Sequence, residues 1–231
     1  MLTTKGFDKI SHKLKYFIRN FKKFMLQKPF LIYIHGGTTF KKRSDYLNYL
    51  KNKEVNLEEQ KKWSGEYLEE ALKSNFNLIR IKMPLKENAR YKDWKIIFEK
   101  YLKLLKQKNT LTVFLGYSLG SIFLIKYFSE NKVDLKLKSI HLVAPPFDNS
   151  NSVEELSGGF RLGKNLRLFS KQFKSIYFYF SKDDQIVGRY HWQKYQEKLP
   201  QAKFLIFKNK NGHFRVEKFP ELIKNLLYYG Y

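Results

Sequence analysis

Three separate stretches of the sequence hold the residue types needed for nucleophilic acyl transfer. Ser118 lies in the run GYSLG, Asp184 in SKDDQIV and His213 in NGHF. A serine hydroxyl is a weak nucleophile near neutral pH, so it needs a base within hydrogen-bond reach and a carboxylate that holds the base in the correct tautomer. The sequence therefore predicts Ser118 as nucleophile, His213 as general base and Asp184 as the acid that orients it.

The residues around Ser118 fit a sharp turn between a strand and a helix, which we call the elbow. Such a turn presses the positions two before and two after the serine against neighbouring backbone, and Gly116 and Gly120 occupy these positions. The serine itself is expected in a strained conformation with its hydroxyl exposed.

Other residues compete for the roles of acid and base. Asp183 is adjacent to Asp184, and only one of the two can face the histidine. Asp184 is preferred because the apolar pair Ile186-Val187 after it can anchor the following turn. The remaining histidines are expected in core, surface or turn positions: His12, His35, His141 and His191.

Strand and helix patterns alternate along the chain, and each chemical stretch follows a strand. Apolar runs predict strands over 29–34, 76–82, 111–115, 137–143, 175–180 and 202–207. Helical spacing predicts helices over 63–74, 94–105, 190–198 and 219–229 and directly after the elbow. This alternation predicts an α/β fold: a mostly parallel sheet of about six strands with helices on both faces. Chemistry in such sheets collects at the carboxyl ends of the strands.

Three segments lie outside this alternation. Residues 1–28 form a basic amphipathic helix pattern, predicted either to pack on the protein's own domain or to bind an anionic membrane or a partner. The α/β domain itself is assigned to 29–231, with 40–62 as a polar, partly helical surface insertion. Residues 147–172 are loop-rich and too short for a separate cap domain.

Composition narrows the classes of function. The formal net charge of +24 makes nucleic acid, anionic membrane or acidic partners candidates, but lysine is spread over nearly every segment, so no specific nucleic-acid partner is expected. The absence of cysteine excludes disulfides and thiolate metal sites. No metal-site or cofactor motif appears, and no apolar run reaches the roughly 20 residues of a membrane span. A cytoplasmic protein, peripheral to a membrane if residues 1–28 bind one, is expected.

The motifs HGG at 35–37, GYSLG, SKDDQIV and NGHF, in this order, resemble the α/β-hydrolase superfamily. More narrowly, the sequence is similar to compact serine hydrolases of the retinoblastoma-binding protein nine family, from about Lys28 to Leu227. The resemblance implies a Ser118-Asp184-His213 triad and oxyanion donors from the backbone N–H groups of Gly37 and Leu119. The chain departs from that family at Gly188, where proline is frequent, in the long 40–62 segment and in the N-terminal extension.

These observations predict a serine hydrolase that cleaves an ester, thioester or amide in a small acyl-containing substrate, without metal or cofactor. The alternative is a non-catalytic binding protein of the same fold that uses its basic surface on acidic partners. A third hypothesis combines hydrolysis with recruitment to anionic membranes by residues 1–28.

Overall fold

The computed structural model of the protein describes residues 27–58, 60–150 and 155–229. Its centre is one six-stranded sheet in which every strand pair is parallel, in the order β2-β1-β3-β4-β5-β6. The strands are β1 (Phe30–Ile34), β2 (Asn77–Ile81), β3 (Thr112–Tyr117), β4 (Leu137–Val143), β5 (Ser175–Ser181) and β6 (Lys203–Phe207).

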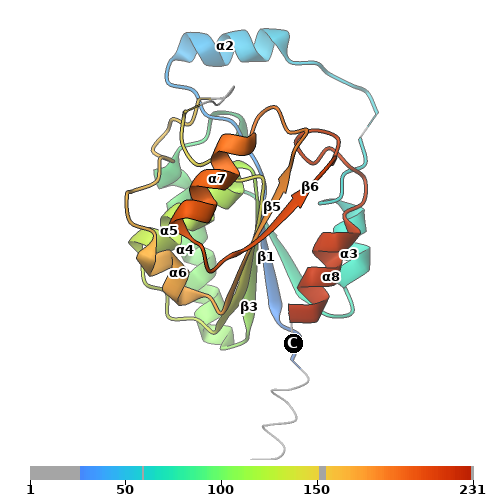
Figure 1. The fold of residues 1–231 in the computed structure, drawn as a ribbon, viewed down its shortest axis with the longest axis vertical. Coiled ribbons are helices and arrows are strands. Elements are labelled where there is room, and N and C mark those ends of the chain that lie inside the picture. Colours follow the sequence, from blue (N-terminus) through green and yellow to red (C-terminus); the bar gives the residue numbers. More distant parts are fainter. Residues whose placement is uncertain (1–26, 59, 151–154, 230–231) are drawn as a thin grey trace, which may run out of the picture.

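Helices cover both faces of this sheet (Figure 1). The pair α3 and α8 lies on one face, and α4, α5, α6 and α7 lie on the other. The helices are α2 (Arg43–Asn52), α3 (Glu66–Leu72), α4 (Tyr91–Lys108), α5 (Leu119–Glu130), α6 (Arg167–Gln172), α7 (Arg189–Lys198) and α8 (Pro220–Tyr229), with a short 3-10 helix η1 (Lys86–Asn88). The predicted α/β architecture is therefore confirmed.

The strand order reverses between β1 and β3. The chain runs from β1 outward to β2, then returns past β1 to β3 and continues through β4, β5 and β6. Loops that leave the carboxyl ends of two strands at such a switch point diverge and open a crevice. The HGG loop follows β1 and the serine elbow follows β3, so both lie at this point.

Helix α5 is central to the core because it is apolar on all sides. Every described residue from Leu119 to Ile125 is buried, as are Tyr127 and Phe128. Phe123 packs edge to face on Trp94 and Phe98 of α4, at centroid distances of 5.6 and 5.2 Å. These contacts fix the start of α5, and hence the elbow, against the sheet.

The three segments set apart in the sequence analysis have different outcomes. Residues 147–172, expected to be loop-rich, also contain the short helix α6, whose Phe169 is fully buried. The insertion at 40–62 contains α2, which lies apart from the body at one end of the molecule (Figure 1). The helix predicted over residues 1–28 lies almost entirely outside the described residues.

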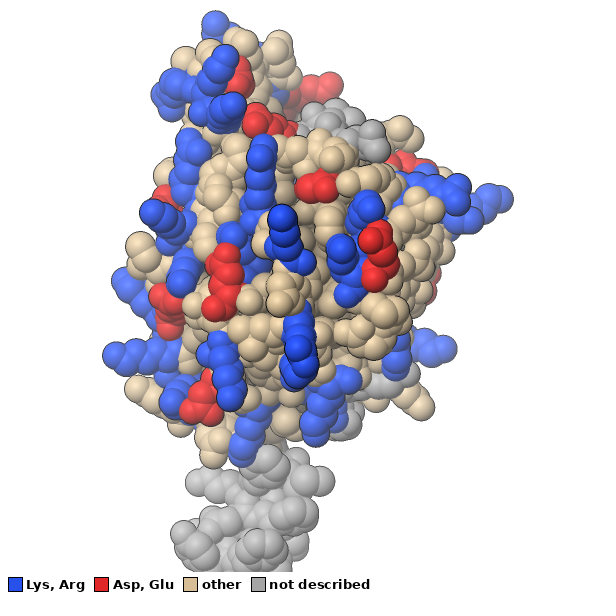
Figure 2. Space-filling view, turned by 60° about the vertical axis from the view of Figure 1, so that its left-hand side comes forward, with Lys and Arg blue, Asp and Glu red and all other residues tan. Residues whose placement is uncertain are grey.

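Lysine and arginine side chains are spread over the face shown in Figure 2, with acidic side chains among them. Among the described helices, none combines the length and apolar character that a bilayer span requires.

Candidate active site

Ser118 occupies a strained turn between β3 and α5. Its backbone angles are φ 51° and ψ −119°, a region that side-chain-bearing residues rarely adopt. A Cβ at Gly120 would lie 2.3 Å from the Ile34 carbonyl oxygen, and one at Gly116 would lie 2.6 Å from Ser121 Cα. Only glycine therefore fits at positions 116 and 120, two residues before and two residues after the serine, as the motif's spacing predicts.

The HGG loop packs directly on this elbow. A Cβ at Gly36 would lie 3.3 Å from Ser118 Cβ, and one at Gly37 would lie 2.4 Å from the Lys86 carbonyl oxygen. Thr38 N–H donates to that same carbonyl at 2.8 Å, which ties the loop after β1 to the loop after β2. The glycines thus allow the loop's backbone to approach the serine.

His35 holds these two loops together. Its Nε2 accepts the Met83 N–H at 3.0 Å, and its Nδ1 lies 2.7 Å from the Gly36 carbonyl, so the proton is assigned to Nδ1. Burial lowers the pKa of this imidazole. With both ring nitrogens engaged by backbone groups, His35 fits the structural role expected for it.

Gly37, Leu119 and Ser118 line one small pocket. The N–H groups of Gly37 and Leu119 have no acceptor within the described residues, and Leu119 is the first residue of α5. The other lining residues are Thr38, Thr39, Pro146, Glu155, Leu156, Ile186 and Val187. Two unpaired donors beside a serine hydroxyl are the arrangement that stabilises a negatively charged oxygen.

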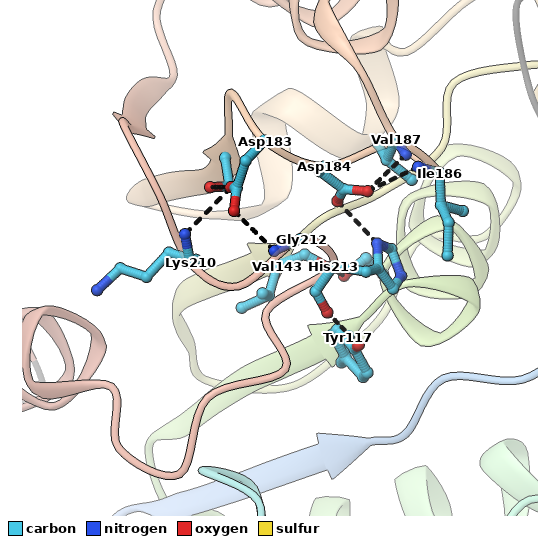
Figure 3. Close-up of polar contacts among 11 residues, drawn as sticks. Tyr117, Val143, Asp183, Asp184, Ile186, Val187, Lys210, Gly212 and His213 are labelled. Atoms are coloured by element: carbon cyan, nitrogen blue, oxygen red, sulfur yellow. Dashed lines mark hydrogen bonds and ion pairs between the residues drawn. The ribbon is translucent and has the colours of Figure 1, made fainter.

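Asp184 and His213 form a buried pair. The Nδ1–H group of His213 donates to Asp184 Oδ2 at 2.7 Å, and Asp184 Oδ1 accepts the N–H groups of Ile186 and Val187 at 2.8 and 2.9 Å (Figure 3). Burial raises the pKa of Asp184, but the imidazole and the two amides outweigh it and lower the pKa below its usual range. The carboxylate therefore stays ionised and holds the proton of His213 on Nδ1, which leaves Nε2 as the basic nitrogen.

The Asp183 side chain points away from this pair, and its carboxylate binds backbone N–H groups of the loop that carries His213. Its Oδ2 accepts the Gly212 N–H at 2.8 Å, and its Oδ1 accepts the Lys210 N–H at 3.1 Å and the Ser181 hydroxyl. Burial raises the pKa of Asp183, and these donors lower it by more. The two adjacent carboxylates thus have different partners, a division that the sequence left open.

Tyr117, next to the serine, contacts His213 from the other side. Its hydroxyl donates to the His213 carbonyl oxygen at 2.6 Å, and the two rings lie 5.3 Å apart (Figure 3). Sequence reasoning missed this residue, because nothing in the motif indicates a partner so far along the chain. Tyr117 therefore links the elbow to the histidine loop.

The structure brings the predicted residues to one edge of the sheet, with one contact not formed. No hydrogen bond joins the Ser118 hydroxyl to His213 in the described part of the chain. Hydrogen bonds of catalytic groups are often long or unformed without substrate. Tyr117, adjacent to Ser118, nevertheless touches His213, so the two functional loops are in direct contact.

Two further histidines are buried elsewhere. His141 in β4 lies 2.8 Å from the Tyr179 hydroxyl, and burial lowers its pKa to about 3. His191 in α7 accepts the Phe147 N–H at 3.1 Å, and burial lowers its pKa as well. None of His141, His191 and His213 is among the residues that line the Ser118 pocket. His213 differs from the other two in its bond to Asp184 and its contact with Tyr117, the neighbour of Ser118. His12 lies outside the described residues, and no group of three potential metal ligands occurs among those that are described.

No protein-family model and no curated protein matches the sequence. Solved structures do match. The ydeN gene product of B. subtilis is 20% identical and superimposes with a TM-score of 0.66, over 87% of this chain and 98% of its own. MGS-M1, an α/β-hydrolase enzyme from a Medee basin deep-sea metagenome library, is 16% identical with a TM-score of 0.54, over 79% of this chain and 69% of its own. The chain has the α/β-hydrolase fold. The Pyrococcus furiosus esterase Pf2001 shares this α/β-hydrolase fold at 16% identity and a TM-score of 0.56, over 89% of this chain and 85% of its own. The narrower resemblance to the retinoblastoma-binding protein nine family is not confirmed by these structures.

Proposed function

We propose that the protein is a serine hydrolase that transfers the acyl group of an ester, thioester or amide to water. The observation that carries the proposal is the surroundings of Ser118: a strained elbow, two N–H groups in the same pocket without an acceptor among the described residues, and an Asp184–His213 pair formed by the loops after β5 and β6. A structural serine needs none of these features. The names of two similar structures, a hydrolase enzyme and an esterase, support the same class of reaction.

In this mechanism the Ser118 oxygen attacks the carbonyl carbon of the substrate while His213 Nε2 takes its proton. The reaction requires the imidazole to come within hydrogen-bond reach of the hydroxyl once substrate is bound. The Gly37 and Leu119 N–H groups donate to the tetrahedral oxyanion. When the tetrahedral intermediate breaks down, the bond between the carbonyl carbon and the leaving group breaks. The leaving group accepts the proton from His213.

Water completes the cycle. His213 takes a proton from a water molecule, whose oxygen attacks the acyl-serine, and then returns a proton to Ser118. Asp184 stays ionised throughout and stabilises the imidazolium. No step uses a metal or a cofactor.

Labelling with a fluorophosphonate probe tests the nucleophile. Wild-type protein is expected to label, and Ser118→Ala to lose both labelling and turnover of a short acyl ester by several orders of magnitude. Ser129→Ala is a matched control, because Ser129 lies in α5, the helix that begins directly after Ser118, and its hydroxyl donates to the Ile125 carbonyl. Failure of the wild type to label, or equal labelling of Ser118→Ala, would refute the proposal and favour a non-catalytic binding protein.

A further inference from the structure

Helix α2 has no buried residue, although it is ten residues long. An isolated helix of this length is marginal in water, because burial of an apolar face provides most helix stability in proteins. The described body of the molecule provides only a small contact. A helix with this composition therefore gains from a further surface that covers it.

The two sides of α2 differ in what they contact. Tyr46 and Tyr49 face Phe40, with ring centroids 5.5 and 5.2 Å apart, and are half-buried. Leu47 and Leu50 are 40% and 38% exposed. Leu47, Leu50 and Lys51 lie next to one another by helical spacing. Arg43 lies between them and the tyrosines, with its guanidinium carbon 5.2 Å from the centre of the Tyr46 ring.

Exposed aliphatic side chains are concentrated around this helix. Of the eight large hydrophobic side chains that are exposed among the described residues, four lie between Leu47 and Leu57. Val55 and Leu57 are 91% and 105% exposed. A fifth, Leu85, is 69% exposed and has a left-handed φ of 47°, an unfavourable conformation for leucine. We call residues 40–57 together with Leu85 the apolar rim.

Cationic side chains predominate in the apolar rim. Between Phe40 and Leu57 the chain carries five cationic side chains and two carboxylates, Asp45 and Glu54. At the end of the molecule formed by α2, Figure 2 shows basic side chains with some acidic and many uncharged side chains between them. Aliphatic side chains interspersed with lysine, arginine and tyrosine are the composition of segments that lie in the interface of an anionic bilayer.

The apolar rim is continuous with the candidate active site. It begins directly after Thr38 and Thr39, which line the Ser118 pocket. An ion pair between Lys53 and Glu87 ties its other end to the loop after β2. Any surface that binds to the apolar rim would therefore lie at the mouth of the Ser118 pocket.

We infer that the apolar rim is a docking surface for an anionic lipid bilayer, with Leu47, Leu50, Val55, Leu57 and Leu85 entering the interface. A bilayer fits better than a folded partner, because exposed aliphatic side chains on a projecting segment suit insertion among lipids, and cations beside them suit anionic headgroups. This inference goes beyond hydrolysis and does not require it.

Vesicle co-sedimentation of the full chain tests the inference. Binding is expected to phosphatidylcholine vesicles that contain phosphatidylglycerol, with weaker binding to pure phosphatidylcholine and at high salt. Leu47→Glu with Leu50→Glu is expected to reduce the affinity about tenfold or more, which corresponds to about 1.4 kcal/mol or more. Ile96→Glu with Leu104→Glu is the matched control, because both residues are 57% exposed on α4 and the charge change is the same.

A second readout measures insertion directly. The natural sequence has no cysteine, so Leu47→Cys and the control Ile96→Cys each carry a single site for an environment-sensitive fluorophore. Anionic vesicles are expected to shift the emission of the Leu47→Cys conjugate to the blue and to leave the Ile96→Cys conjugate unchanged. Circular dichroism checks that each variant remains folded.

Several outcomes would overturn the inference. Absence of vesicle binding by the full chain is one. Unchanged binding after the α2 substitutions would assign any membrane affinity to another segment, such as residues 1–28. An equal loss in the α4 control would indicate a charge effect alone. Light scattering that shows a dimer broken by the α2 substitutions, without vesicle binding, would indicate self-association.

Discussion

The sharpest prediction concerns the adjacent carboxylates Asp183 and Asp184, which the structure assigns to different partners. In Asp184→Asn, the amide oxygen is expected to keep the Ile186 and Val187 N–H groups, which places the NH₂ group against His213. Because an amide NH₂ can only donate, His213 Nδ1 becomes an acceptor and its proton moves to Nε2. That nitrogen can then no longer take the proton of Ser118.

The expected loss in kcat for Asp184→Asn is about 10⁴-fold, the size found when a triad histidine is held in the wrong tautomer. KM is expected to change little, because the substituted side chain lies behind the imidazole. The fold should persist, since the substitution preserves shape and the contacts of the amide oxygen.

Asp183→Asn is expected to act on stability instead. Its two oxygens accept the Lys210 and Gly212 N–H groups, and an asparagine side chain has only one acceptor oxygen. One backbone N–H therefore loses its partner, at a cost of about 1 to 2 kcal/mol in the free energy of unfolding at this partly buried site. kcat is expected to fall by no more than about tenfold, through a looser histidine loop.

Steady-state hydrolysis of a short acyl ester and urea unfolding, measured on both variants, separate the two roles. Asp184→Asn should have near-normal unfolding and almost no turnover, and Asp183→Asn should have weakened unfolding and substantial turnover. The opposite pattern, or equal loss of turnover in two folded variants, would refute this division of labour. Fluorophosphonate labelling of Asp183→Asn would confirm that its serine is still activated.

Other perturbations have equally definite outcomes. Tyr117→Phe removes the hydrogen bond to the His213 carbonyl and is expected to lower the free energy of unfolding by about 1 kcal/mol and kcat by a few-fold, as urea unfolding and ester kinetics would show. Gly120→Ala places a Cβ 2.3 Å from the Ile34 carbonyl oxygen and is expected to cost about 3 kcal/mol or more, or to prevent folding; a normal melting temperature would contradict this. His141 is held neutral by burial, with a pKa of about 3, so the unfolded chain binds its proton first as the pH falls below about 6.5. Its contribution to stability is complete above that pH and falls by about 2 kcal/mol between pH 7 and 5, so the loss of stability between these two pH values, measured by urea unfolding, should be smaller by about this amount in His141→Asn.

The sequence predicted the class of fold and the type of site because both depend on local pattern. Buried parallel strands appear as short apolar runs and covering helices as 3.6-residue periodicity. The β4 prediction, 137–143, agrees with the observed Leu137–Val143. Ser118, Asp184 and His213 could be selected because each follows a strand, and parallel strands bring their carboxyl ends to the same edge.

Boundaries and irregular segments were harder to predict. Helix α4 runs from Tyr91 to Lys108, longer at both ends than the predicted 94–105. The short helix α6 was missed in a region rich in turn residues, because its formation depends on burial of Phe169 against distant residues. Local propensity is weak where tertiary packing decides.

Only the tertiary structure decided the contacts between residues that are far apart in the chain. Sequence order does not give strand order, so the switch point between β1 and β3 could not be read from it. Adjacent aspartates look alike in sequence, and only the surrounding donors distinguish the one that pairs with His213 from the one that holds its loop. The link from Tyr117 to His213 and the exposure of the leucines on α2 likewise depend on how loops and helices pack. The sequence by itself determined which residues could do chemistry and on which edge they meet, because strand direction and alternation are local properties. Packing determined which partner each residue has.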